Sequence, residues 1–535
     1  MLRGTVKLKR CGYVRPHGVT DLNILRQRIK AAAQLPVLRH MAWFFDSYYF
    51  PAVYAVLVFL CSVLGWEIAF FALTALAVVF ICVFSRDSRP MLAFVFLTTY
   101  CISWKHTPQP PFSSDFFYDS GVQTYLLCLG ILLIVCMLFR FIVFPQDRNF
   151  FKESKLRLGI ALMVAALLLN GVFFGGYTIA DLPFGLLIAL SLFVFYIFFF
   201  HTMRTDENTV RYVAYIMVLA SGVIFLQLAK IYIFDDIIVE GSVNKDILVS
   251  GWGMSNNVGG MLGMLFPACF YMAVKSRRGG WAFYVLAFVF FGGVCLTLSR
   301  TSALVSGIVL VASAIYLSIS KSNIRKFVRI FNCVVLVGGI VFLIVMWDFI
   351  RELLAVYFDR GFSDSGRFFI WESGIKNFLR APVFGVGFYE PIAPDWSYNI
   401  ENWIFPDMYH NLFIQMLASC GIFGIIALCV HLVQVLFAIK KSPNTQSLFC
   451  LIIFAGIFGM SLLDNHIFHI FPAFIYSVFL LLSEREGESG PLVLLRPLLI
   501  GRKKAVQQGS GEVAATAGNT GIDNISGANG ADDRV

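Results

Sequence analysis

The sequence has few charged residues. Only 14% of its 535 residues are charged, whereas 58% are hydrophobic and the mean hydropathy is +0.77. A soluble globular domain carries about 25% charged residues, so the composition excludes that class. It predicts an all-α, polytopic integral membrane protein, and the 56 Phe residues suit helices that face lipid.

Common motifs of soluble hydrolases, zinc proteases and nucleotide-binding enzymes are also missing. The sequence contains no H-E-x-x-H, G-x-S-x-G or Walker pattern. Its twelve cysteines include no C-x-x-C pair, so we expect no disulfides or metal ligands among them. No metal and no cofactor is expected for this protein. Seven cysteines lie inside apolar runs and are expected to be small buried hydrophobic residues: Cys61, Cys82, Cys128, Cys136, Cys295, Cys429 and Cys450.

A net charge of +10 raises the question of nucleic acid. The Lys and Arg residues, however, occur in short clusters between apolar runs, which is typical of cytoplasmic loops beside anionic lipid. We therefore expect contact with membrane lipids and no nucleic-acid partner.

Fourteen apolar runs approach or reach the length of a membrane span, which is about 20 residues for a helix. One run is short and the first two are almost contiguous, so the sequence predicts about 12–14 transmembrane helices. The runs cover residues 48–65, 67–84, 91–104, 121–142, 157–175, 184–201, 211–233, 258–274, 281–299, 303–320, 327–347, 411–439, 446–463 and 467–482.

The loops between these runs differ in charge. When alternate loops are assigned to opposite sides, the Lys and Arg clusters fall on one side, and the short loops of the other side are poor in both. The positive-inside rule places the basic side and both termini in the cytoplasm. The basic side includes Arg86, Arg89, Arg148, Lys152, Arg204, Lys275, Lys321, Arg325, Lys440 and Arg502.

This topology predicts three parts. Residues 1–47 form a basic cytoplasmic N-terminal extension, which lacks the short apolar core of a cleavable signal. Residues 48–482 form the transmembrane domain. Residues 483–535 form a cytoplasmic tail that is expected to be largely disordered, because it is rich in Gly, Ala, Ser and Asn from about residue 506.

One large extracytoplasmic loop, residues 348–410, combines charged and aromatic residues. Its Arg367 is suited to a phosphorylated substrate, because the planar guanidinium can hold two phosphate oxygens. The segment PVFGVGF predicts a tight turn. The segment RFFIWESGIKNFL predicts an amphipathic helix on the membrane surface, or more simply an aromatic anchor, with an apolar face formed by Phe368, Trp371, Ile375 and Phe378.

Arg300 lies in the connection LTLSRTSALVSG, at the outer end of two apolar runs. An Arg at the membrane boundary is costly and usually faces a cavity or a partner. The alternative is an interfacial residue whose side chain reaches the lipid headgroups.

His410 opens the stretch YHNLFIQMLASCGIFG, where the outer loop enters the next apolar run. A helix N-terminus disfavours the imidazolium, so we expect a neutral ring that can accept a proton. Asn411 is placed to orient this ring or a substrate. Gly421 and Gly424 are expected to permit close helix contact deeper in the run. An interfacial histidine without a catalytic role is the alternative.

His466 and His469, in the stretch LLDNHIFHIF, are weaker candidates. Their i, i+3 spacing is compatible with a metal pair, but no third ligand is evident nearby in the sequence. His106 and His201 are interpreted as interfacial.

Together, these motifs resemble the O-antigen ligase and polymerase superfamily of bacterial membrane glycosyltransferases. The hallmark of that superfamily is His, then Asn, Ser or Gln, then nine residues and Gly-x-x-Gly. His410, Asn411, Gly421 and Gly424 match it in full. An Arg-x-x-x-Leu element of the family is matched by 300–304.

Two further segments resemble the family. Gly366, Arg367, Trp371 and the 382–387 turn fit a periplasmic-loop pattern, and SNNVGGML around Asn257 fits an upstream segment more weakly. The resemblance covers roughly residues 210–440, which makes 48–482 a glycosyltransferase-like domain.

The resemblance implies glycosyl transfer on the outer face of the bacterial cytoplasmic (inner) membrane. The donor would be a glycan on undecaprenyl diphosphate, and the acceptor a sugar hydroxyl on another lipid-linked glycan or on a lipid core. Arg300 and Arg367 would bind the diphosphate and His410 would take the acceptor's proton, with inversion at the anomeric carbon. Expected substrate-binding residues are Asn411, Tyr409, Trp371 and Asn257.

The sequence leaves several alternatives open. Polymerase and ligase use the same chemistry on different acceptors, and other polysaccharide-assembly proteins remain open as partners. A transporter of an anionic or lipid-linked substrate would need polar or charged residues near the middle of several spans. Few are found, because Glu67 lies near a boundary and Gln227 is isolated. A catalytically inert scaffold is a third possibility.

Overall fold

The computed structural model describes residues 17–102, 119–146, 148–235, 237–239, 242–243, 247–251, 253–276, 278–348, 351, 366–390, 408–440 and 445–484. All of them belong to the first of two compact units, Met1–Leu492 and Val493–Val535. The predicted disordered tail, the first sixteen residues and much of the 348–410 loop lie outside the described residues. The three-part division of the chain therefore stays a prediction.

Helices make up nearly all the secondary structure. The only sheet in the described part is a short antiparallel hairpin, in which β1 (Ile238–Val239) pairs with β2 (Ser242–Val243). The helices are α1 (His17–Ala32), α2 (Pro36–Phe45), α3 (Tyr49–Leu64), α4 (Glu67–Phe84), α5 (Met91–Leu97), η1 (Thr98–Cys101), α7 (Ser120–Val143), α8 (Phe150–Glu153), α9 (Arg157–Leu168), α10 (Asp181–Thr202), α11 (Glu207–Phe234), α12 (Ser255–Leu265), α13 (Ala268–Lys275), α14 (Gly280–Leu296), α15 (Arg300–Ile319), α16 (Arg325–Val345), α18 (Arg367–Arg380), α19 (Leu412–Lys440), α20 (Thr445–Asp464), η4 (His466–Phe468) and α21 (Ile470–Glu484).

Every apolar run of the sequence coincides with one helix or with two consecutive helices. Within the described residues, nine helices are long and apolar enough to cross a membrane, and α2 with α3 forms a further candidate that is bent by 73°. The other runs correspond to four shorter apolar helices. The all-α, polytopic membrane fold is therefore confirmed.

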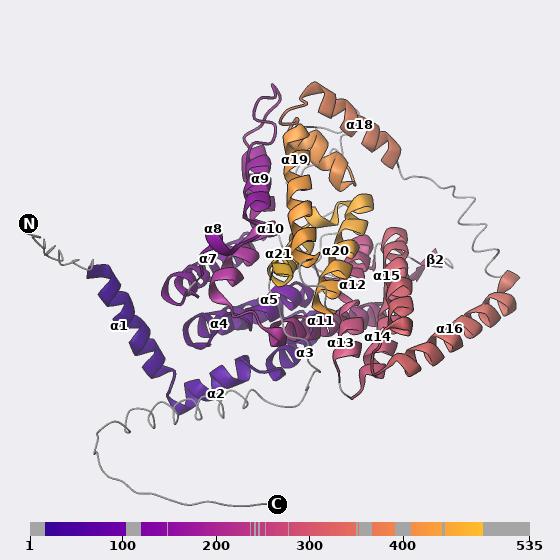
Figure 1. Ribbon diagram of the computed structural model, residues 1–535, viewed down its shortest axis with the longest axis horizontal. Helices are drawn as coiled ribbons and strands as arrows, with labels where there is room; N and C mark the ends of the chain where they lie inside the picture. Colours follow the sequence, from indigo (N-terminus) through magenta and orange to yellow (C-terminus); the bar gives the residue numbers. More distant parts are fainter. Residues whose placement is uncertain are drawn as a thin grey trace, which may run out of the picture. The chain divides into compact units, whose positions relative to one another are not determined.

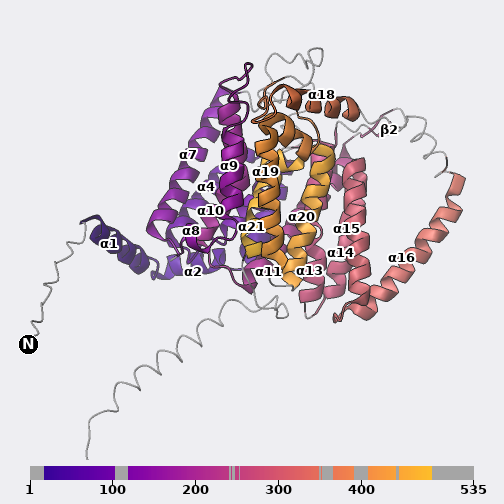
Figure 2. The ribbon, with the colours of Figure 1, turned by 45° about the horizontal axis from the view of Figure 1, so that its top comes forward.

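The helix that begins at the candidate histidine lies inside the bundle. α19 packs against α9, α20 and α21, and α10 packs along α21 (Figure 1). The α12–α13 segment is the most enclosed of the candidate spans, with 89% of its apolar window buried. In Figures 1 and 2, α18 lies across the end where α19 begins, whereas α16 diverges from α14 and α15.

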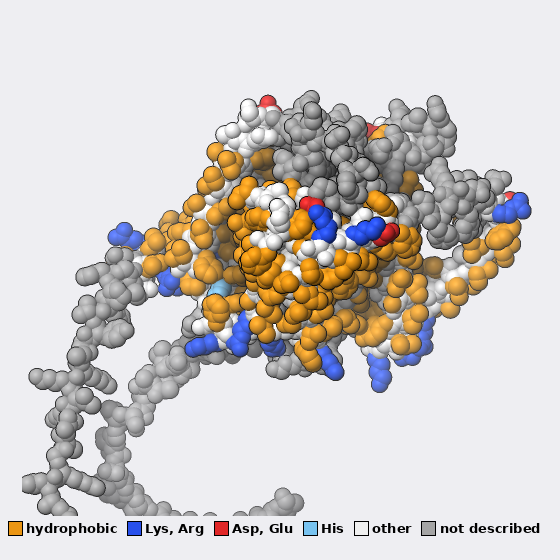
Figure 3. All heavy atoms as spheres, turned by 90° about the horizontal axis from the view of Figure 1, so that it is seen from above, with side chains coloured by type: hydrophobic (Ala, Val, Ile, Leu, Met, Phe, Trp, Pro, Cys, Tyr) orange, Lys and Arg blue, Asp and Glu red, His pale blue; other side chains and the backbone are white. Residues whose placement is uncertain are grey.

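The surface is largely hydrophobic. Figure 3 shows a broad hydrophobic band with most visible Lys and Arg side chains along one edge. Three cysteines predicted to be buried are instead exposed, namely Cys128, Cys295 and Cys429. The prediction was wrong for these three because a helix in lipid turns one apolar side outward, where lipid tails replace protein contacts.

The helix predicted in the outer loop is present as α18, and two residues of its predicted apolar face are exposed, which is compatible with a helix whose apolar side meets a membrane surface. Phe368 and Ile375, from the predicted apolar face, are 68% and 46% exposed. Small and polar side chains let α18 approach α19 closely, so the larger apolar ones remain outside. A position on the membrane surface stays a prediction. The buried side of α18 is formed by Ile370, Ser373, Gly374 and Asn377.

α19 is broken at Gly421, where φ is 66° and ψ is −160°. Essentially only glycine adopts this combination. The PVFGVGF segment inserts at the break, where Val386 N–H donates to Ala418 O at 2.9 Å. A Cβ at Gly421 would lie 2.4 Å from the Val383 carbonyl oxygen of that segment. The expected helix contact at Gly421 is therefore wrong, because this glycine makes room for a loop.

Candidate active site

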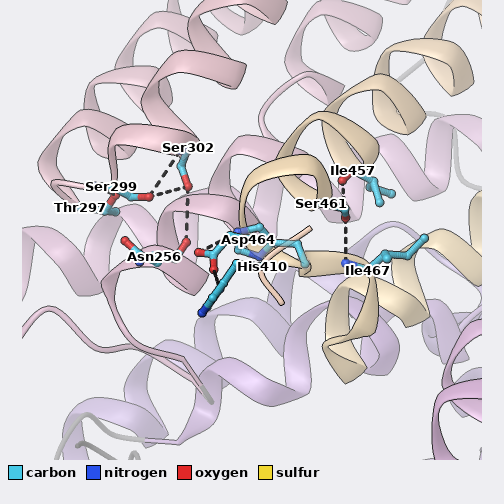
Figure 4. Close-up of polar contacts among 10 residues, drawn as sticks. Asn256, Thr297, Ser299, Ser302, His410, Ile457, Ser461, Asp464 and Ile467 are labelled. Carbon is cyan, nitrogen blue, oxygen red and sulfur yellow. Dashed lines mark hydrogen bonds and ion pairs between the residues drawn. The ribbon is translucent and has the colours of Figure 1, made fainter. Parts of the chain in front are cut away.

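His410 lies just before α19 and contacts a carboxylate at the end of α20. Its Nδ1 is 2.8 Å from Oδ1 of Asp464 (Figure 4). With Asp464 ionised, Nδ1–H donates this hydrogen bond, and Nε2 is the nitrogen that can accept a proton. The His410 side chain is 43% exposed, whereas that of Asp464 is only 11% exposed. The pair thus presents an accessible basic ring oriented by an almost buried carboxylate.

Backbone strain concentrates around this pair and around Arg300. The non-glycine residues with positive φ in the described chain are Leu298 (56°), His410 (50°) and Asn465 (49°). Each such residue costs about 1–3 kcal/mol and persists only where the surrounding structure enforces it. Leu298 lies two residues before Arg300, and Asn465 follows Asp464 directly. Strain of this kind clusters at active sites and ligand clamps, which supports a functional site here.

Buried amides hold the two strained turns beside each other. The Oε1 of Gln415, which is fully buried in α19, accepts from Tyr409 N–H at 2.9 Å and from Asn465 Nδ2 at 3.0 Å. The Asn411 side chain accepts from two backbone N–H groups of the first turn of α19 and donates to Leu462 O at 3.0 Å. The start of α19 is thereby fixed to the end of α20.

A second imidazole lies behind Asp464. The His466 side chain, in η4, is buried, and its Nε2 is 3.9 Å from Oδ2 of Asp464. Burial is the main cause that lowers the pKa of His466 to about 4, so the ring is neutral at neutral pH. The described residues hold no group of three His, Cys, Asp or Glu side chains suited to a metal ion.

Arg300 is the first residue of α15, and its side chain is exposed. The helix is capped by Ser299, whose Oγ accepts from Ser302 N–H at 3.4 Å. The Ser302 hydroxyl donates to Asn256 O at 3.4 Å, which joins α15 to the start of α12 (Figure 4). The helix cap therefore fixes the start of α15, and with it the position of Arg300.

Two adjacent glycines of α12 connect this cap to the buried histidine. A Cβ at Gly259 would lie 3.1 Å from Ser299 Cβ, and one at Gly260 would lie 2.5 Å from Cε1 of His466. The start of the Arg300 helix and His466 therefore contact the same turn of α12. Asn257, on the same helix, is half-buried.

Arg367 is the first residue of α18, and its side chain is half-buried. Its charge acts on His466 and contributes to that residue's lowered pKa, so it lies at the same end of the bundle. α18 contacts the start of α19 through Tyr409, whose hydroxyl accepts from Asn377 Nδ2 at 2.8 Å and whose ring packs near Trp371.

Asp181, the first residue of α10, holds the PVFGVGF segment from the other side. Its Oδ1 accepts from Phe388 N–H at 2.6 Å and from Tyr389 N–H at 3.1 Å, and its Oδ2 accepts from Thr178. Because the same segment is bonded to α19 at Gly421, α10 supports the half-helix that begins beside His410.

The structure brings His410 next to Asp464 and His466, and it places Arg300 and Arg367 at the same end of the bundle. The sequence interpretation missed Asp464 and Gln415. Asp464 stood in the stretch LLDNHIFHIF, but its partner is 54 residues away in the chain. Gln415 stood inside an apolar run. Substrate-binding roles stay predictions for Asn411, Tyr409, Trp371 and Asn257.

Residues 285–429 match the family model described as O-Antigen ligase. The matched segment covers about a quarter of the chain and contains Arg300, Arg367, His410 and both glycines of the Gly-x-x-Gly element. Comparison with curated proteins gives no match. The family match supports an O-antigen ligase/polymerase-type function, and over this segment it confirms the resemblance to the O-antigen ligase/polymerase superfamily that the motifs predict.

Proposed function

We propose that this membrane protein is a polysaccharide polymerase or ligase that transfers a glycan from undecaprenyl diphosphate to a sugar hydroxyl on the outer face of the cytoplasmic membrane. The family match supports the ligase or polymerase type of function and lipid-linked glycans as the general substrate class. The observation that carries the proposal is the 2.8 Å contact of His410 with the almost buried Asp464.

In this scheme His410 is the general base. Asp464 holds the Nδ1–H, so Nε2 takes the proton of the acceptor hydroxyl. The hydroxyl oxygen bonds to the anomeric carbon as the bond from that carbon to the diphosphate oxygen breaks, and the electron pair leaves with undecaprenyl diphosphate. Attack opposite the leaving group inverts the anomeric configuration. The Asp464 carboxylate stabilises the imidazolium that forms.

Arg300 and Arg367 have the role of stabilising the diphosphate as charge grows on it. Each begins a helix at the end of the bundle where His410 lies. A helix N-terminus adds unpaired N–H groups and partial positive charge, which favour a phosphate. The guanidinium fork adds two-point binding of phosphate oxygens.

The aromatic residues contribute in two ways. The indole Nε1 of Trp371 is buried and has no hydrogen-bond partner in the described part of the chain, so it offers a donor to a sugar hydroxyl. Tyr409, by contrast, is only 2% exposed. It contributes chiefly by holding α18 against α19, next to the base.

Glycan transfer by the purified protein, supplied with an undecaprenyl-diphosphate-linked glycan from the source cells, tests the base. His410→Ala is expected to lower the rate by about 10²–10⁴-fold, the usual contribution of a general base, with unchanged membrane abundance. His40→Ala is the matched control and is expected to stay active, because His40 is an exposed residue of α2 outside the His410–Asp464 pair. Normal transfer by His410→Ala would refute the assignment.

Supplying lipid A-core separates the two acceptor classes. Chain elongation without the core favours a polymerase, and transfer only in its presence favours a ligase. The transporter alternative gains no support from Gln227, because this residue donates to Ser62 at 2.9 Å and to Tyr100 O at 2.6 Å. Gln227 therefore serves the packing of the helices.

A further inference from the structure

The buried imidazole of His466 has no part in the scheme above. It is 0% exposed, and both of its ring nitrogens lack a hydrogen-bond partner among the residues that the structure describes. Buried polar groups in native proteins are nearly always hydrogen-bonded, so this exception needs an explanation. The nearby carboxylate of Asp464 supplies one.

The position of the His466 ring is fixed from two sides. Asn465 turns the chain between Asp464 and His466 with a φ of 49°, and its amide is bonded to Gln415. On the other side, a Cβ at Gly260 would lie 2.5 Å from Cε1 and 2.8 Å from Nε2 of the ring. Only a glycine lets α12 come this close. The strained turn and the glycine together hold Nε2 near Oδ2 of Asp464.

We propose that His466 is a positioning residue, which donates its Nε2–H to Oδ2 of Asp464 and so fixes the carboxylate that orients His410. This inference rests on the proposed function. The present separation of 3.9 Å is about 1 Å longer than a hydrogen bond. Hydrogen bonds in active sites often shorten when substrate binds. Each oxygen of Asp464 then has one imidazole donor.

A neutral ring is suited to this role. His466 lies in the connection between α20 and α21, and burial is the main cause that lowers its pKa to about 4. The negative charge of Asp464 opposes this lowering of the pKa. Positive charge nearby adds to the lowering, from His469, His410 and Arg367. The glycine of α12 that faces the ring carries no charge. A neutral imidazole donates a hydrogen bond without neutralising the carboxylate. The charge of Asp464 then remains available to the imidazolium that forms on His410.

Two substitutions separate a hydrogen-bond donor from a space filler. His466→Gln keeps an N–H near the position of Nε2, and His466→Phe fills similar space without one. With the undecaprenyl-diphosphate-linked glycan as probe, we expect His466→Phe to lower kcat about tenfold or more with KM little changed. His466→Gln is expected to keep most of the activity. His40→Phe, at an exposed position of α2, is the matched control and should leave kcat unchanged.

Stability measurements distinguish positioning from packing. His466→Phe is expected to unfold at the same or a higher temperature than the wild type at neutral pH, because it buries no unpaired N–H. In an Asp464→Ala background, His466→Phe should lower kcat no further, since the carboxylate is absent. Equal losses of kcat in the Gln and Phe variants, no loss in either, or a full further loss in the Asp464→Ala background would each overturn the proposal.

The proposed function can fail separately. Normal transfer by His410→Ala would refute the function itself, whereas loss in His410→Ala with normal kcat in His466→Phe would refute only the role of His466.

The pH dependence of stability is a readout without substrate. An unfolded His binds its proton near pH 6.5 but folded His466 only near 4, so this contribution to stability is lost as pH falls through that window. His466→Gln should lack this loss, and an unchanged acid slope would contradict a buried neutral ring.

Discussion

Leu298, His410 and Asn465 each hold a left-handed backbone conformation. For a bulky residue such as Leu298 this conformation is a clear outlier. His410 and Asn465 are linked through Gln415, so the strain of one turn is balanced by hydrogen bonds that also hold the other. The shared support brings the imidazole and the carboxylate to 2.8 Å. The geometry of the site therefore depends on residues that do not touch the substrate in the proposed scheme.

The two arginines allow a test of two-point phosphate binding. Arg300→Lys and Arg367→Lys keep the charge but lose the guanidinium fork. Hydrogen bonds to charged groups contribute about 1.5–3 kcal/mol, so we expect kcat/KM for the lipid-linked donor to fall about 10–100-fold. Initial rates at several donor concentrations measure this. Arg329→Lys, at the start of α16, is the control, because Arg329 binds a backbone carbonyl at 2.8 Å within its own helix pair. Lys variants with wild-type kcat/KM would contradict the role.

Single residues differ in how far the sequence predicts them. Arg300, Arg367 and His410 are identifiable because charged or titratable groups at a membrane boundary are rare and costly. Asp464 is not, because an acid at the end of an apolar run is equally compatible with a plain boundary residue. Its partner is set by how α19 packs on α20, which no local pattern encodes. The same holds for Gln415, whose polarity is hidden within an apolar run.

At the scale of helices, length and apolarity were sufficient to predict the helices of the fourteen apolar runs, but not α1, α2 and α8, which lie outside those runs. Lipid offers no hydrogen bonds, so a long apolar run must satisfy its backbone within a helix. The break at Gly421 was not predicted, because its cause is tertiary: backbone groups of the 382–387 turn replace those of the helix. The face of α18 that packs against α19 was not predicted for a related reason, since a close approach depends on small and polar side chains that the apolar pattern does not mark.

Gly421→Ala tests the broken helix. The new Cβ would meet the Val383 carbonyl oxygen at 2.4 Å in a backbone conformation that alanine disfavours. We expect a loss of about 1–3 kcal/mol or more in stability, with glycan transfer reduced because the half-helix beside His410 shifts. Thermal unfolding of the purified protein, followed by the transfer assay, measures both.

Gly456→Ala in α20 is the matched control for this substitution. A Cβ there would meet nothing within 4 Å, and alanine favours a helix over glycine by about 1 kcal/mol. The control is therefore expected to unfold at the same or a higher temperature than the wild type. If Gly421→Ala behaved like Gly456→Ala in both assays, the break would have no structural importance.

At the scale of the whole first unit, α19 runs from the proposed site at its N-terminus to a basic residue, Lys440, at its C-terminus. α19 has 29 residues, which at 1.5 Å per residue is about 43 Å even before its break is considered. The hydrocarbon core of a bilayer is about 30 Å thick, so α19 is long enough to cross it. His410 precedes its first residue and Lys440 is its last. If positive charge marks the cytoplasmic side, the proposed site opens on the outer side.

Cysteine labelling tests this orientation. In a variant without native cysteines, Lys376→Cys places a thiol on the exposed side of α18, and Lys440→Cys places one at the far end of α19. A membrane-impermeant maleimide added to intact cells should label the first and spare the second, whereas both should react after the membrane is permeabilised. Labelling of Lys440→Cys in intact cells, with protection of Lys376→Cys, would put His410 in the cytoplasm. His410 could then not reach a donor presented on the outer face. The labelling result therefore tests both the proposed position of the site and the proposed substrate.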